Sequence, residues 1–147
     1  MSDYLQTLRL FSPKLRLFFL GMGILAMVPF GIVAVLLNLY LLRLGFDARY
    51  IGLLAGMGQV VWAAAALPAG LLGNRIGLRN NLEAGVFAFS IALALILLVE
   101  LLPPAYWQAW LLGCQVLLNL GVAMITVTVP AYVMALTGER ERKHAFG

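Results

Sequence analysis

Four polar residues in the last long apolar stretch of the chain are spaced so that they would share one side of a helix. They follow one another at intervals of seven, four and seven positions: Gln108, Gln115, Asn119 and Thr126. At 100° per residue, all four fall within an arc of about 40°. Amides and hydroxyls in hydrocarbon need hydrogen-bond partners. This polar stripe is therefore expected to face either a water-filled cavity, where it would contact a solute, or another helix.

Few other side chains could bind a solute, bind a metal or take part in catalysis. Asn38 is the single amide of the first apolar stretch, and it is either a second candidate for solute contact or a bond between helices. One cysteine (Cys114) and one histidine (His144) form neither an intrachain disulfide nor a Cys/His metal cluster, so we expect no metal and no cofactor. An intramembrane protease would need facing Ser and His, but Ser90 is the only serine in an apolar stretch and His144 lies near the chain end. We therefore expect no enzyme.

The elements that position these residues are long apolar helices. Of 147 residues, 63% are hydrophobic and 11% are charged, against about 25% charged in soluble domains. A bilayer core of about 30 Å needs about 20 apolar residues per helix. The uncharged runs and Pro103–Pro104 predict spans at about 16–43, 50–73, 82–102 and 106–136, followed by a tail at 137–147, with helix breaks at Pro29 and Pro130. This indicates an all-α polytopic membrane protein with four transmembrane helices in one domain, 1–147.

The charges predict how these helices are oriented in the bilayer. Ten Lys plus Arg and six Asp plus Glu give a net charge of +4. Eight of the ten basic residues fall on the side that holds both termini and the 74–81 connection, and only Arg43 and Arg49 fall on the other. The positive-inside rule then places both termini in the cytoplasm, with the protein in the cell membrane. The basic excess sets orientation and predicts contact with lipid, and it does not suggest a nucleic-acid partner. Aromatic residues gather near the opposite boundary: Tyr40, Tyr50, Tyr106, Trp107 and Trp110.

The second span carries a face without bulky side chains. The residues on this small-residue face are Gly52, Ala55, Gln59, Ala63, Ala66 and Gly70. Faces of this kind permit close approach of helix backbones. We expect a tightly packed neighbour, which could be a helix that this chain does not supply.

The connection between the second and third spans resembles the signature loop of the major facilitator superfamily, whose pattern is G-x-L-(A/G)-D-R-x-G-R-(R/K). The residues that match are Gly70, Leu72, Gly73, Arg75, Gly77 and Arg79, while Asn74 replaces the Asp and Leu78 replaces a basic residue. From the residues alone, Gly73 and Gly77 permit a compact turn, and Arg75 and Arg79 can neutralise helix ends, headgroups or Glu83. The resemblance implies that this loop bonds to a helix of the other half of the transporter and so closes the cytoplasmic side. Asn74 would take part in this contact through hydrogen bonds and without a charge.

Two further stretches are similar to the same family. The tail at 138–147 resembles the loop that introduces the fifth helix, with matches at Arg142, Ala145 and Gly147. The fourth span resembles a motif in which an Arg precedes two glycines; Gly121 matches, whereas Gln115 replaces the Arg and Asn119 the first Gly. That Arg is associated with proton coupling, so proton coupling through this motif is not expected here.

The family implies twelve helices in two halves, each half built from two three-helix repeats. The chain is therefore expected to be an N-terminal fragment of a secondary active transporter of a small solute, with the first and fourth spans lining the cavity and the remaining helices as its partners. Alternating access between the halves would be the mechanism. The alternative is a small self-associating four-helix protein, as a dimeric exporter or a non-catalytic scaffold. The small dimeric exporters use a Glu in the first span, and residues 17–42 contain no acid.

Overall fold

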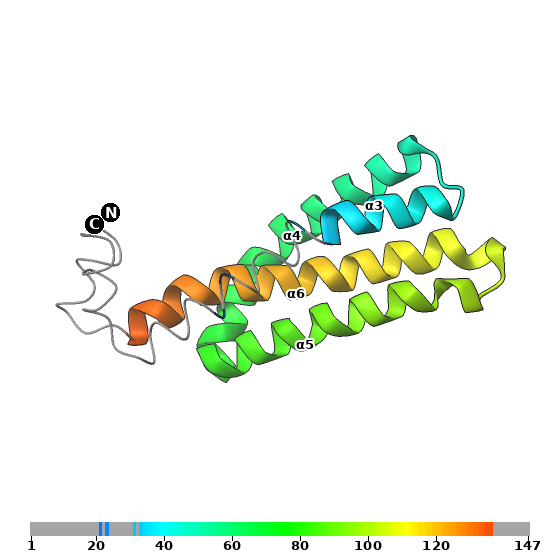
Figure 1. Cartoon of the computed structure of the whole chain (residues 1–147). Helices are drawn as coiled ribbons and strands as arrows, with labels where there is room; N and C mark the ends of the chain where they lie inside the picture. The colour runs from blue at the N-terminus through cyan, green and yellow to red at the C-terminus, as the bar shows by residue number, and fades with distance from the viewer. Residues whose placement is uncertain (1–20, 22, 24–30, 32, 137–147) are drawn as a thin grey trace, which may run out of the picture. The chain divides into compact units, whose positions relative to one another are not determined.

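The computed structural model describes residues 21, 23, 31 and 33–136. The chain divides into two compact units, residues 41–131 and residues 1–40 with 132–147. Every regular element among the described residues is a helix (Figure 1). The helices Ala48–Ile76, Leu78–Leu101 and Pro104–Met134 are long and apolar enough to cross a membrane. This confirms an all-α, multi-pass membrane protein.

Helix α3 (Ala34–Arg43) forms the last part of the first predicted span, and it ends at Arg43. A glycine turn follows, in which the Phe46 N–H donates to the Leu41 carbonyl at 3.1 Å and the Gly45 N–H to that of Leu42 at 3.0 Å. Gly45 has a φ of +88°, the left-handed geometry that commonly ends helices. The predicted break at Pro29 and the tail at 137–147, with its three family matches, lie outside the described residues.

Helix α4 (Ala48–Ile76) is capped at its N-terminus by Asp47, whose carboxylate accepts the Tyr50 N–H at 2.9 Å. The connection between the second and third spans is shorter than the predicted 74–81, because α4 continues through Ile76 and α5 begins at Leu78. Only Gly77, with a φ of +90°, separates the two helices. A glycine accepts this geometry without the clash that a Cβ would cause, so a single residue is enough to reverse the chain.

Helix α5 (Leu78–Leu97) continues into the 3₁₀ helix η2 (Leu98–Leu101), and it starts four residues earlier than the predicted span at 82–102. Leu102 is extended, as the residue before a proline usually is, and Pro104 opens the 3₁₀ helix η3 (Pro104–Tyr106). Helix α6 (Trp107–Leu136) then returns along the bundle with Pro130 inside it. The chain therefore turns at Pro103–Pro104, and α6 covers the range of the fourth predicted span.

Helices α5 and α6 lie side by side (Figure 1), and they touch backbone to backbone at two glycines. A Cβ at Gly121 would lie 2.7 Å from the Phe89 nitrogen and 2.8 Å from the Gly85 carbonyl oxygen. A Cβ at Gly85 would lie 2.9 Å from the Cβ of Met124. In lipid, the hydrophobic effect does not hold helices together, and close glycine crossings of this kind allow van der Waals contact between the helices instead.

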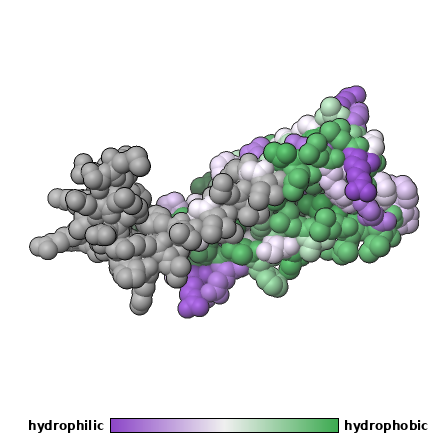
Figure 2. Space-filling view, in the orientation of Figure 1, coloured by the Kyte–Doolittle hydropathy of each residue, from purple (hydrophilic) through white to green (hydrophobic). Residues whose placement is uncertain are grey.

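The outer surface is apolar. Figure 2 shows hydrophobic residues over most of the visible face, with hydrophilic residues gathered toward its ends. Large exposed side chains include Val60, Leu67, Phe87 and Leu101. Lipid chains solvate such side chains without penalty, so this surface fits contact with the bilayer. We call the end at which α4 begins the Asp47 end, and the end at which α4 meets α5 the Gly77 end.

Candidate functional site

The polar stripe of α6 contacts helix α4. A Cβ at Gly58 of α4 would lie 2.6 Å from Nδ2 of Asn119 and 2.7 Å from Nε2 of Gln115. These two amides therefore occupy the space that the missing side chain of Gly58 leaves open. The stripe was expected to face either a water-filled cavity or another helix. Among the described residues, Gln115 and Asn119 face a helix.

The hydrogen bonds of these amides are incomplete. Asn119 is 6% exposed, and its Nδ2 donates to the backbone carbonyl of Gln115 at 2.9 Å. The side-chain oxygen Oε1 of Gln115 is buried and has no hydrogen-bond partner within the described part of the chain. Buried polar atoms without partners are uncommon, and each calls for an explanation. Gln115 is thus a free acceptor at the α4–α6 contact.

Thr126 makes a second contact between the same helices. The indole N–H of Trp62 donates to Oγ1 of Thr126 at 3.1 Å, and Oγ1 donates to the Ala123 carbonyl at 3.2 Å. Trp62 lies in the middle of α4, so this tryptophan bonds a neighbouring helix and does not belong to the interfacial belt. Pro130 has no N–H to offer the Thr126 carbonyl one turn before it, which leaves that carbonyl outside the helix ladder.

Gln108, the remaining residue of the stripe, lies outside this contact. Gln108 is exposed at the Asp47 end, where its backbone carbonyl accepts the Tyr50 hydroxyl at 2.9 Å. Tyr50 stacks on Phe46 with ring centroids 4.6 Å apart. Asn38 is exposed on α3.

The small-residue face predicted on α4 is mostly exposed. Gly52, Ala55, Gln59 and Ala63 are exposed, and Ala66 is half-buried. The face of α4 that is buried among the described residues is a different one, made of Leu54, Gly58, Ala65, Ala69 and Gly73. Helix α4 thus has two faces of small residues, of which one packs within this chain.

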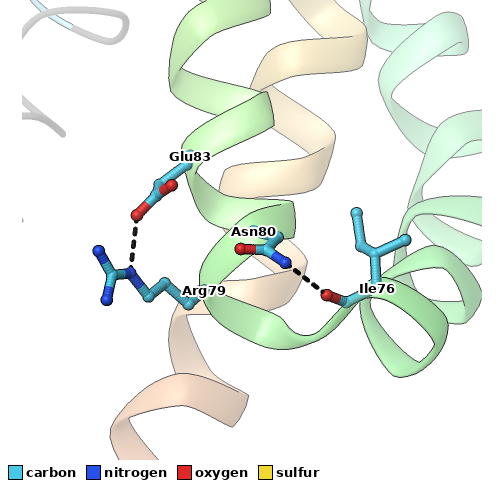
Figure 3. A network of polar contacts seen from close by, with 4 residues as sticks. All are labelled: Ile76, Arg79, Asn80 and Glu83. Carbon is cyan, nitrogen blue, oxygen red and sulfur yellow. Dashed lines mark hydrogen bonds and ion pairs between the residues drawn. The ribbon is translucent and has the colours of Figure 1, made fainter.

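The residues that match the family loop lie on the last turns of α4 and the first turn of α5. Gly73 is buried in α4 and does not form the turn that the sequence suggested; a Cβ there would lie 3.1 Å from Nδ2 of Asn81. Leu72, Asn74 and Arg75 are exposed. The guanidinium Nε of Arg79 lies 2.8 Å from Oε1 of Glu83, which was one of the three kinds of partner that the sequence allowed (Figure 3).

A groove opens beside these residues at the Gly77 end. Its volume is about 520 Å³, and it lies between the last turns of α4 and the part of α6 near Pro130. Its lining is mainly apolar and small, with Gly70, Asn74 and Leu78 on one side and Val127 and Ala131 on the other. The family-loop residues Gly70, Gly73 and Asn74 therefore line one side of a groove.

Sequence reasoning missed Asn81 and Thr128, which are both buried. Asn81 donates to Oγ1 of Thr128 at 2.6 Å and to the carbonyl of Ala69 at 3.2 Å. The expected third span began at residue 82, which assigned Asn81 to a loop. Had the helix been started at Leu78, the spacing of Asn81 with Gly85 and Phe89 would have placed it on one face with them.

In the part of the chain that the structure describes, no three His, Cys, Asp or Glu side chains lie close enough together to bind a metal ion. The structure instead offers neutral amides, hydroxyls and backbone carbonyls. Such groups bind by hydrogen bonding.

Comparison with known families decides the assignment. Residues 5–147 match the Major Facilitator Superfamily. The chain belongs to this superfamily. Its members are membrane transporters, so the chain takes part in transport across a membrane. No curated protein and no solved structure matches the chain significantly.

Proposed function

We propose that the chain is the N-terminal part of a secondary active transporter that moves a small solute by alternating access. Membership of the superfamily supports this, since its transporters consist of two six-helix halves that rock about a central site. The exposed small-residue face of α4 provides a surface for the remaining helices. In this proposal the protein is no enzyme: the hydroxyl of Ser90 is bonded to its own helix, at the Val86 carbonyl.

The observation that carries the solute site is the unpartnered Oε1 of Gln115. An acceptor without a hydrogen bond in one conformation can gain one when a solute donor or a water molecule reaches it. This gain favours a conformation in which the α4–α6 contact is open to solute or water. Asn119, Thr126 and Gln108 continue the same stripe, and Asn38 is retained as a candidate for solute contact from the sequence alone. Because all five are uncharged, this part of the transporter fits a solute bound through hydrogen-bond donors.

The Gly77 end is the proposed gate. Asn74 and Arg75 are exposed beside the groove, where a helix of the other half could bond to them. Asn74 donates and accepts hydrogen bonds but carries no charge, so a latch through this residue would depend little on membrane voltage. The bias of Lys and Arg supports a cytoplasmic location for this end and for both termini, in a cell membrane. Labelling single cysteines at Asn74 and Arg49 from outside intact cells tests this: only the Arg49→Cys protein should react.

The solute site is tested by removing hydrogen-bonding groups from the stripe. The full-length transporter is reconstituted in liposomes, incubated with a small-molecule cell extract, and the accumulated compounds are measured by mass spectrometry. Gln115→Leu and Asn119→Leu should abolish accumulation of the transported compound. Asn80→Leu is the matched control, because the Asn80 side chain bonds the Ile76 carbonyl at the end of α4 and not α6 (Figure 3).

A different result favours helix association as the role of the stripe. If Gln115→Leu and Asn119→Leu reduce the folded fraction while transport per folded molecule is unchanged, the cavity assignment fails. The exposed face of α4 would then fit the second candidate function, a self-associating membrane protein or scaffold. Disulfide crosslinking of Ala55→Cys between two copies in the membrane would identify that case.

A further inference from the structure

Asn81 joins three helices through one side chain. It is fully buried, with an exposure of 0%, in the first turn of α5. Its amide nitrogen donates to the Ala69 carbonyl of α4 at 3.2 Å and to the Thr128 hydroxyl oxygen of α6 at 2.6 Å. The residues it connects are 12 and 47 positions away in the sequence.

The backbone of Asn81 also closes the turn at Gly77. Its N–H donates to the Gly77 carbonyl at 3.1 Å, and the Gly77 N–H donates to the Gly73 carbonyl at 3.0 Å. Gly73 makes room for the amide, since a Cβ there would lie 3.1 Å from Nδ2. One residue therefore belongs to the turn through its backbone and to α4 and α6 through its side chain.

The contact is poorly suited to a purely stabilising role. The side-chain oxygen Oδ1 of Asn81 is buried and has no partner within the described residues. An unsatisfied buried acceptor is unfavourable, whereas replacing both partners of a buried hydrogen bond by apolar groups of similar shape is often nearly neutral. A leucine and a valine would fill the positions of Asn81 and Thr128 without an unpaired atom. The hydrogen bonds of the amide are directional and so fix the position of one helix relative to another. A buried Asn in a coiled coil fixes helix register in the same way, at the expense of stability.

We propose that Asn81 is a positioning residue that fixes the Gly77 turn, and with it Asn74 and Arg75, relative to α6. The turn is a single glycine, so its orientation depends on contacts outside it. Asn81 supplies these contacts to both neighbouring helices. Movement of α6 is thereby transmitted to the residues of the proposed gate. This effect on gating rests on the proposed transport function.

Asn80 provides an internal control for this proposal. It has the same side chain and precedes Asn81 in the same helical turn, but it is exposed and bonds only the Ile76 carbonyl (Figure 3). Removing its amide changes the polarity of the turn without touching α6. Any effect that Asn81 exerts by position should therefore be absent when Asn80 is replaced.

The test measures the position of the turn directly. In a Cys114→Ala background of the full-length protein in lipid nanodiscs, nitroxide labels on Ile76→Cys and Leu120→Cys report the distance from the turn to α6 by pulsed electron spin resonance. Both labelled side chains are exposed. The distance distribution should be single and narrow in the parent protein, in the Asn80→Leu variant and in Thr128→Ser, which keeps the hydroxyl. It should broaden or split when Asn81→Leu is combined with Thr128→Val.

Stability and transport separate positioning from packing. For the Asn81→Leu, Thr128→Val double variant, we expect the apparent Tm to stay within about 4 °C of the parent. We expect the maximal transport rate to fall about tenfold while the apparent KM is unchanged.

Several results would overturn the proposal. These are an unchanged distance distribution in the double variant, failure of that variant to fold, or the same broadening with Asn80→Leu. The distances do not depend on transport. If the parent protein accumulates no compound, the proposed function fails while the distance measurement still decides whether Asn81 positions the turn.

Discussion

Helix α6 packs against two neighbours by different chemistry. Against α5 it uses Gly121, whose backbone lies against that of Gly85 and Phe89 with no polar side chain between them. Against α4 it uses amides and a hydroxyl that occupy the recess at Gly58 or bond to Trp62. The Gly121 crossing has no spare hydrogen-bonding group, whereas the α4–α6 contact has an unpartnered oxygen at Gln115. The unpartnered oxygen of Asn81 lies one turn before that crossing, at the start of α5.

This difference indicates which contact is rigid. Backbone atoms cannot move aside, so a glycine crossing has one low-energy arrangement. Side-chain amides rotate and can exchange a partner in one helix for a solute or another residue. We therefore interpret α5–α6 as a fixed pair and the α4–α6 contact as the place where partners can change.

The largest effect is expected at the α5–α6 crossing. Gly121→Ala places a methyl group 2.7 Å from a backbone nitrogen, and the free energy of unfolding should fall by about 3 kcal/mol. Denaturant titration in micelles measures it. Gly113→Ala is the control, since a Cβ there meets nothing within 4 Å, and it should leave stability equal or higher. A loss below that of Gly58→Ala would contradict the rigid interpretation of α5–α6.

A smaller effect is expected at Gly58. The atoms nearest to the added methyl group in Gly58→Ala belong to the Asn119 and Gln115 side chains, whose amide ends can rotate away. We expect a loss of about 1 kcal/mol in the same titration, together with a clear fall in transport rate because the amides are displaced. Gly56→Ala, which has open space, should change neither. An unaltered transport rate in Gly58→Ala would separate the α4–α6 amides from the solute pathway.

The bond between Trp62 and Thr126 should contribute less. Trp62→Phe keeps a large aromatic ring but removes the donor, and bonds between helices in membranes average about 0.6 kcal/mol. A double-mutant cycle with Thr126→Val isolates the bond from other changes. A coupling energy near zero would mean that the side chains lie close together without stabilising the α4–α6 contact.

The smallest effect is expected for the pair Arg79–Glu83, which lies within one helix. Both side chains are largely exposed, at 78% and 62%, so the pair should contribute about 0.3 kcal/mol. Arg79→Gln and Glu83→Gln, alone and together, measure this coupling in low and high salt. A coupling energy above that of Trp62–Thr126 would contradict the expectation that bonds between helices contribute more than this exposed pair.

Much of the fold follows from local sequence. The stop at Pro103–Pro104 and the end of the first span at Arg43 were predicted, because backbone sterics and the avoidance of charge in hydrocarbon act over a few residues. The start of α5 was misplaced by four residues, since Arg79, Asn80 and Asn81 were assigned to a loop. The polar stripe was predicted as a stripe, but the sequence left open whether it meets a helix or a cavity.

The candidate site was predicted less well because its contacts are distant in sequence. The meeting of Asn81 with Thr128 joins residues 47 positions apart, and the recess at Gly58 has meaning only beside Gln115 and Asn119. The sequence indicated a different small-residue face on the same helix, and Gly58 was not among the predicted contacts. No periodicity distinguishes which of two such faces meets a neighbour.

The sequence by itself determined that this protein is a multi-pass helical membrane protein of the major facilitator superfamily. Hydrocarbon requires each spanning segment to satisfy its own backbone and carry apolar side chains, so that information is local. Only the tertiary structure decided which face of α4 packs, that the last turns of α4 remain helical, and that Asn81 joins three helices. In lipid, an exposed apolar side chain carries no penalty, so hydrophobicity marks the spans but cannot mark the contacts between them.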